Sequence, residues 1–209
     1  LAPDDIEAGA ELAALEMIRS GTTAFADMYC AVDRVAAVVD RAGLRARLGH
    51  GVVTLGKDEP AAAADIDESL SVAAELDGAA DGRIRTAFMP HSLTTVDEDH
   101  LRDGIARAAA ADVPVHLHAN ETADEVDPIV DERGQRPLEY ADELGALGPD
   151  TFLAHCVHVD DAEIDLLADT DTAVVHCPAS NMKLASGMAP VARLREAGVA
   201  VALGTDGAA

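Results

Sequence analysis

The sequence predicts an α/β fold in which helices cover a parallel sheet. Apolar segments rich in Val, Ala and Leu alternate along the chain with amphipathic segments that begin with acidic residues. Such alternation is typical of parallel sheets, because a helical crossover links each strand to the next. The strands are apolar on both faces, as expected for a sheet covered on both sides. No repeat or linker divides the 209 residues, so we expect one domain over residues 1–209.

The first two helices show the signals used for all of them. Asp4 and Asp5 favour a helix start, and Gly21 favours its end, which predicts a helix over residues 1–21. Val35 and Val38 give residues 31–43 one apolar face. Further helices are expected over residues 61–76, 97–111, 137–147, 160–169 and 191–197, with a broken helical stretch over 124–134.

Seven segments are expected to contain strands: residues 22–28, 45–53, 84–92, the first half of 113–121, 151–158, 171–180 and 199–207. Side chains alternate along a strand, so His116 and His118 in the fourth segment share one face and Leu117 takes the other. Two buried imidazoles need partners. A metal ion would be such a partner, and Glu121 would then carry a proton. Hydrogen bonds between core groups are the alternative, and this segment alone leaves both open.

Composition excludes several classes of function. The formal charge is −24, and acidic residues are spread over every expected helix, which disfavours nucleic acid as a partner because its phosphates would be repelled. Molar salt screens such charge within ~3 Å, so we interpret the acidity as halophilic, although an ordinary acidic protein is an alternative. No apolar run approaches the ~20 residues of a membrane span. The three scattered cysteines fit a reducing cytoplasm.

Polar side chains gather where the expected strands end. They are His91, His118 with Glu121, His155, Ser180 with Asn181, and Asp206. The carboxyl ends of the strands in a (β/α)8 barrel form the rim that holds the active site. A single histidine at a strand end is usually structural. Five strands that deliver ionisable or amide groups to one rim favour a functional site.

Six motifs follow one another from end to end of the chain. They are SGTTAFADMY at 20–29, PHS at 90–92, HANE at 118–121, AHCVH at 154–158, HCPASNMKLASG at 176–187 and GTDG at 204–207. In order and spacing they resemble the amidohydrolase superfamily, in the branch of 5-methylthioadenosine/S-adenosylhomocysteine deaminases and chlorohydrolase-like enzymes. The resemblance implies a partial (β/α)8 TIM barrel, strands two to eight of eight, with helices outside a parallel sheet.

The resemblance also implies a role for each site residue. His118 would be a zinc ligand, and Asp206 a second ligand and the proton acceptor. Glu121 would carry a proton between water and the substrate's ring nitrogen. His155 would hydrogen-bond the attacking water or the developing oxyanion, and His91 would contact the substrate, at its ribose. The implied cofactor is Zn²⁺, one per site, with Fe²⁺ as an alternative.

The implied activity is zinc-dependent hydrolytic deamination of an adenine nucleoside, of the 5-methylthioadenosine, S-adenosylhomocysteine or adenosine type, with release of ammonia. One alternative is another aminohydrolase or chlorohydrolase acting on a triazine, guanine or pterin ring. The other is a catalytically inert barrel fragment. The expected partner is thus a small molecule, a purine nucleoside or related heterocycle.

One family feature has no counterpart here, the His-x-His pair of the first strand. The pattern His116-Leu117-His118 is the same, but the following Glu121 marks it as the fifth-strand motif. We therefore expect an internal segment of a longer enzyme, truncated at both ends, which alone binds zinc weakly and turns over little. The strands at residues 22–28 and 199–207 would then have unpaired edges, which favours a homo-oligomer.

Overall fold

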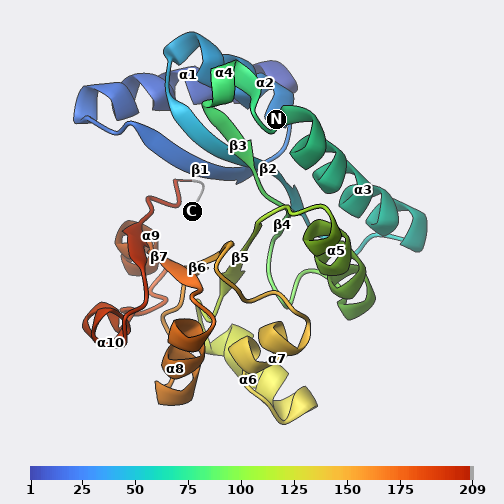
Figure 1. Ribbon diagram of the computed structural model, residues 1–209, viewed down its shortest axis with the longest axis vertical. Coiled ribbons are helices and arrows are strands. Elements are labelled where there is room, and N and C mark those ends of the chain that lie inside the picture. Colours follow the sequence, from blue (N-terminus) through green and yellow to red (C-terminus); the bar gives the residue numbers. More distant parts are fainter. Residues whose placement is uncertain (208–209) are drawn as a thin grey trace.

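Strand and helix alternate along the whole computed structural model, which describes residues 1–207 (Figure 1). The strands are β1 (Ala24–Tyr29), β2 (Arg45–Val52), β3 (Ile84–Thr86), β4 (Met89–Pro90), β5 (Val115–Ala119), β6 (Thr151–His155), β7 (Ala173–His176) and β8 (Val201–Leu203). The helices are α1 (Pro3–Ser20), α2 (Val32–Ala42), α3 (Glu59–Leu76), α4 (Ala79–Gly82), α5 (Glu98–Ala110), α6 (Ala123–Arg133), α7 (Pro137–Glu143), α8 (Asp161–Asp169), α9 (Pro178–Lys183) and α10 (Val191–Glu196).

All strand pairs are parallel, and neighbours in the sheet follow the order of the chain. One group has the order β1-β2-β3, with β4 also paired to β2, and the second has the order β5-β6-β7-β8. Single bridges from Phe88 to Val115 and from Ser92 to His118 join the two groups. Among the described residues, β1 and β8 each pair with only one neighbour, so the sheet is an open, partial barrel. The expected fold class is confirmed.

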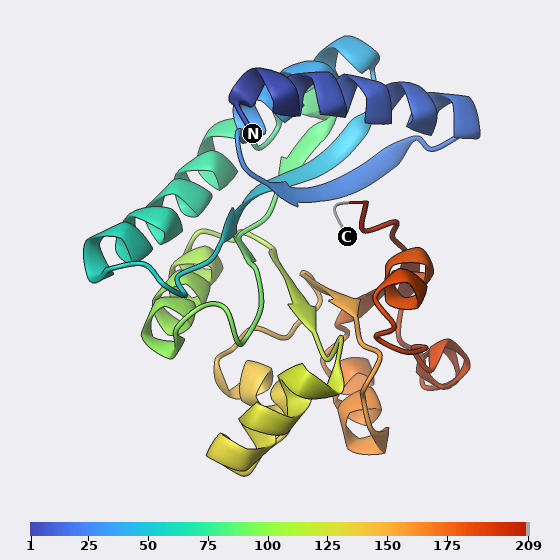
Figure 2. The same cartoon turned by 180° about the vertical axis from the view of Figure 1, so that it is seen from behind.

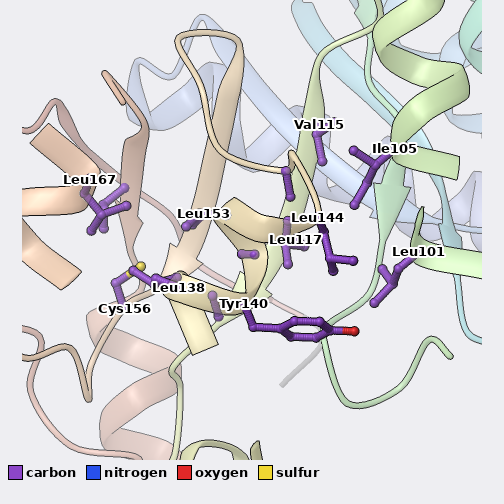
Figure 3. Close-up of a cluster of buried hydrophobic side chains, with 14 of the residues drawn as sticks. Leu101, Ile105, Val115, Leu117, Leu138, Tyr140, Leu144, Leu153, Cys156 and Leu167 are labelled. Carbon is purple, nitrogen blue, oxygen red and sulfur yellow. The ribbon is translucent and has the colours of Figure 1, made fainter. Parts of the chain in front are cut away.

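The helices lie outside the strands (Figures 1 and 2). The apolar core consists of two clusters of buried side chains contributed by both strands and helices. Val35, Val38 and Val39 of α2 are buried, as their spacing predicts. Leu117 and Leu153 are fully buried in the larger cluster, together with side chains of α5, α7 and α8 (Figure 3). Leu117 therefore takes the helix-facing side of β5, and the neighbouring His116 and His118 take the opposite side.

Several expected strands are shorter in the structure, among them those at 151–158 and 199–207, which are β6 and β8. Three further elements need correction. The strand expected over 171–180 ends at His176, because Pro178 opens α9, where its fixed φ and missing N–H suit the first helical turn. The strand expected over 84–92 is divided into β3 and β4. The broken stretch over 124–134 is one helix, α6, with Pro128 inside it. None of the helices within residues 1–207 combines the length and apolar character that a bilayer crossing requires.

Candidate active site

Three imidazoles from neighbouring strands lie side by side at the carboxyl ends of β4, β5 and β6. The ring centroids of His91 and His118 are 4.7 Å apart, and those of His118 and His155 are 5.3 Å apart. His155 is buried, whereas His91 and His118 are partly exposed. The sequence placed these residues on one rim, and the strand pairing brings their rings into a row.

The tautomer of His118 follows from its hydrogen bonds. Both its backbone N–H and its Nδ1 contact the carbonyl oxygen of His91, at 2.9 Å and 2.7 Å. A carbonyl only accepts, so Nδ1 carries the proton and the neutral ring has its lone pair at Nε2. A backbone carbonyl on the second ring nitrogen is the usual arrangement for a metal-ligating histidine. The donor chemistry of His118 therefore fits a metal ligand.

His116, two residues earlier on β5, has a different environment. Its Nδ1 donates to the carbonyl oxygen of Phe152 at 2.8 Å, and its ring stacks on that of Phe152 with centroids 4.2 Å apart. Burial lowers the pKa of His116 to about 3, so the ring is neutral at physiological pH. Of the two interpretations left open by the sequence, His116 matches the hydrogen-bonded core histidine.

Glu121 lies against His155 from the loop after β5. Its Oε2 is 3.6 Å from Nε2 of His155, and its Oε1 accepts a hydrogen bond from Oγ of Ser186 at 2.9 Å. On the other side of the ring, Nδ1 of His155 is 3.0 Å from Oδ1 of Asn181 on α9. Asn181, which the sequence placed among the polar residues at the strand ends, thus orients His155. Ser186 was missed, although it belongs to the 176–187 motif.

Asp206 follows β8 and is partly exposed. Its charge acts on two neighbours at the rim. Burial, and then the proximity of the His118 imidazole, lower the pKa of His91, while the carboxylates of Glu121 and Asp206 act in the opposite direction. Burial, and then the charge of Asp206, raise the pKa of the Cys177 thiol to about 11. Cys177 therefore stays protonated at neutral pH, which disfavours it as a nucleophile or ligand.

Several of these residues have unusual backbone conformations. Asn120, His155 and Asp206 have φ angles of 52°, 74° and 47°, in the left-handed region. Each stands at or just after the carboxyl end of its strand. Non-glycine residues in this region are uncommon, and such strain gathers at functional sites, where the surrounding structure holds it in place.

A buried polar network fixes the loops that present Glu121 and His155. Asn120 donates from Nδ2 to both carboxylate oxygens of Glu163, at 3.1 Å each. Glu163 has no exposed side-chain surface and also accepts from the Arg136 guanidinium and from the backbone N–H of Leu138. One carboxylate on α8 therefore joins the turn after β5 to the start of α7.

The residues expected to bind a metal at the rim are His118 and Asp206. Among residues 1–207, one group of three His, Cys, Asp or Glu side chains brings its ligand atoms within 4.8 Å of one another, and it is His50, Asp65 and Glu68, away from the rim. Catalytic zinc sites usually have three protein ligands. His118 and Asp206 fit such a site by donor type, as two members of a larger set.

A parallel α/β barrel with ionisable side chains at the carboxyl ends of its strands has the architecture of a barrel enzyme. The chain belongs to the amidohydrolase family, whose sequence model matches residues 1–209. The resemblance inferred from the six motifs is therefore confirmed.

Curated relatives of the chain are named as nucleoside deaminases. The chain is 66% identical over its full length to a 5-methylthioadenosine/S-adenosylhomocysteine deaminase of Haloarcula marismortui and covers 48% of that protein. It is 51% identical over 97% of its length to a 5'-deoxyadenosine deaminase of Methanothermobacter thermautotrophicus, of which it covers 47%. The chain thus spans about half the length of the curated relatives it matches. Relatives from Haloarcula and Halobacterium agree with the halophilic interpretation of its charge.

Solved structures show the same fold. An adenosine deaminase from Xanthomonas campestris with bound zinc has a TM-score of 0.87 and 37% identity, over 98% of this chain and 46% of that one. A zinc-complexed atrazine chlorohydrolase from Arthrobacter aurescens has a TM-score of 0.88 at 22% identity, over 98% of this chain and 49% of that one, and its likeness concerns the fold alone.

Proposed function

We propose that residues 1–209 belong to a hydrolytic deaminase of adenine nucleosides, of the 5-methylthioadenosine, S-adenosylhomocysteine or adenosine type. The observation that carries the proposal is the row of His91, His118 and His155, with Glu121 3.6 Å from His155, at the carboxyl ends of adjacent strands. Relatives up to 66% identical over the whole chain are deaminases of 5-methylthioadenosine and S-adenosylhomocysteine or of 5'-deoxyadenosine, which supports the choice of substrate class.

His118, through Nε2, and Asp206 are the residues that we assign to a metal ion. Zinc is our first choice, because imidazole and carboxylate are common zinc ligands and because a zinc-bound adenosine deaminase shares the fold. When bound, zinc lowers the pKa of water from about 15.7 to about 7, which makes a nucleophile available at neutral pH.

Glu121 and Asp206 transfer the protons of the proposed reaction. Glu121 delivers a proton to the ring nitrogen while the water oxygen bonds to the amine-bearing carbon, and Asp206 accepts the proton that the water loses. Nδ1 of His155 is held by Oδ1 of Asn181, which leaves Nε2 for the reaction. Through Nε2, His155 hydrogen-bonds the attacking water or the developing oxyanion. Asp206 then gives its proton to the amine, the bond between the carbon and the amine breaks, and ammonia leaves. The hydroxyl group on the same carbon loses its proton to Glu121 and becomes a carbonyl, so both carboxyl groups return to their starting states.

His91 is assigned to the substrate, at its ribose. Its Nδ1 is 3.0 Å from Oγ1 of Thr95, which leaves Nε2 as the nitrogen for a hydroxyl group of the nucleoside. Burial lowers the pKa of His91, which favours a neutral ring that accepts as well as donates hydrogen bonds.

Ammonia release tests the proposal. The whole protein that contains this chain is incubated with 5-methylthioadenosine, S-adenosylhomocysteine, adenosine, guanine and a chlorinated triazine, and ammonia and chloride are measured. We expect ammonia from the three adenine compounds. Turnover of guanine or the triazine alone would contradict the adenine assignment, and no turnover of any compound by protein loaded with zinc would contradict the enzyme assignment.

A further inference from the structure

A second cluster of ionisable side chains lies outside the rim, where α3 packs against β2. His50 comes from β2, and Asp65 and Glu68 come from α3. The side chains of His50 and Asp65 are only 10% and 11% exposed, whereas that of Glu68 is 60% exposed. The cluster is thus buried at the sheet and open to solvent at Glu68.

The contacts of Asp65 determine which nitrogen of His50 carries the proton. Oδ1 of Asp65 is 3.0 Å from Nε2 of His50, while Oδ2 contacts Nζ of Lys57 at 2.7 Å and accepts from the backbone N–H of Val53 at 3.0 Å. Burial acts to raise the pKa of Asp65, but these three partners lower it below its usual value. An ionised carboxylate only accepts, so Nε2 donates and the neutral ring has its lone pair at Nδ1.

That lone pair faces a second acceptor. Nδ1 of His50 is buried and has no hydrogen-bond partner among the described residues, and Oε1 of Glu68 lies 3.6 Å from it. This separation is too long for a hydrogen bond. It suits two ligands of one zinc ion, because bonds of about 2.0–2.2 Å from each ligand span such a gap at an open angle.

We propose that Nδ1 of His50 and the carboxylate of Glu68 bind a divalent transition-metal ion, Zn²⁺ in the first place, with water completing the coordination. Asp65 is a positioning residue, because it holds the second ring nitrogen in the arrangement common to metal-ligating histidines. Its other oxygen is already used by Lys57 and Val53.

The charges agree with a cation. Lys57 and Asp65 neutralise each other, so Glu68 leaves the cluster with one negative charge in a chain of formal charge −24. The imidazole–carboxylate pair favours zinc over magnesium or calcium, which prefer oxygen ligands. Bound at this place, the ion would join α3 to β2, and it takes no part in the deamination proposed above.

Metal content tests the proposal. The purified protein is equilibrated with chelator-buffered Zn²⁺, freed of excess ion, and its zinc per chain is measured by mass spectrometry. The variants are Glu68→Gln and, as a matched control on the exposed surface of the same helix, Glu75→Gln. Zinc at the rim contributes equally to all three proteins, so the difference between them reports this cluster alone.

We expect the wild type and Glu75→Gln to hold one zinc more per chain than Glu68→Gln, whose affinity falls at least about tenfold. Zinc should also raise the thermal unfolding midpoint of the first two more than that of Glu68→Gln. Because Glu68 is exposed, its replacement leaves the fold intact. Equal zinc content in all three proteins would overturn the proposal, whatever the outcome of the ammonia assay.

Discussion

At the scale of the residue, His116 and His118 show how two similar side chains acquire different roles. They are two positions apart on β5 and share one face of the strand. His116 is stacked on Phe152, and its proton is fixed by a carbonyl of β6. His118 is bonded to the carbonyl of His91 and lies between the rings of His91 and His155. The two side chains differ in role because His116 contacts β6, whereas His118 contacts the residue that follows β4.

Replacing His116 by Gln should make the protein less sensitive to acid. Burial lowers the pKa of His116 from 6.5 to about 3. Between these two pH values His116 is protonated in the unfolded chain but not in the folded one. The free energy of unfolding therefore falls as the pH drops through this window. Gln keeps a donor for the carbonyl of Phe152 and does not titrate.

Urea unfolding at several pH values between 7.5 and 4 measures the effect. The fall in unfolding free energy with acid should be shallower for His116→Gln than for the wild type. Parallel curves for the two proteins would contradict the assigned cause.

Replacing Glu121 by Gln should lower the kcat of deamination by about 10²–10⁴-fold, the usual contribution of a positioned acid or base. Gln retains an oxygen to accept the hydrogen bond from Ser186 but cannot carry the proton. Glu132→Gln, an exposed change on α6, is the charge-matched control and should retain wild-type kcat. A Glu121→Gln protein with wild-type kcat would exclude the assigned role.

At the scale of the element, α9 and the loop after it contribute more to the site than expected. Pro178 ends the extended segment and starts a helix, which places Asn181 beside His155. The loop then returns Ser186 to Glu121, and the carbonyl of Ser186 also accepts from Nε2 of His158. This segment therefore orients two proposed catalytic side chains, His155 and Glu121.

Replacing Glu163 by Ala should destabilise the protein by about 1–3 kcal/mol, because it removes the fully buried partner of the Arg136 guanidinium, which keeps its ion pair with Asp160. The change also removes the acceptor of Asn120 and Leu138. Asp165→Ala, an exposed position on the same helix, controls for helix propensity and should change stability by less than about 0.5 kcal/mol. Denaturant unfolding measures both, and similar values for the two variants would contradict a structural role for the network.

At the scale of the whole molecule, charge and unpaired edges are the dominant features. The strands β1 and β8 each have one paired neighbour among the described residues. Exposed strand edges favour association with further strands, so the expected homo-oligomer stays a prediction that light scattering tests. The formal charge of −24 opposes such association unless salt screens it.

Lowering the salt concentration should destabilise the protein. At about 0.1 M salt the screening length is about 10 Å, against about 3 Å at 1 M, so repulsion among the surface carboxylates increases. We expect the thermal unfolding midpoint to fall when NaCl is reduced from molar to 0.1 M concentration. Sucrose at equal water activity is the control, and a midpoint restored equally by sucrose would show that screening is not the cause.

Much of the fold could be predicted, because hydrophobic period and end signals are local properties of the chain. Six of the seven expected strand positions contain a single strand, and the seventh, residues 84–92, contains two short ones. The wrong end of the strand at 171–180 has a local cause, since Pro178 suits either a strand end or a first helical turn. In the structure Pro178 is the first residue of α9, so the strand ends before it.

The sequence by itself determined the alternation of elements, the family and the set of polar residues that follow the strands, because each depends on residues close together in the chain. Only the tertiary structure decided which of these residues meet. Ser186 bonds Glu121 across 65 positions, and His50 meets Asp65 from a different element. Such contacts depend on strand register and helix docking, and these are set by the packing of the whole core, which no local pattern specifies.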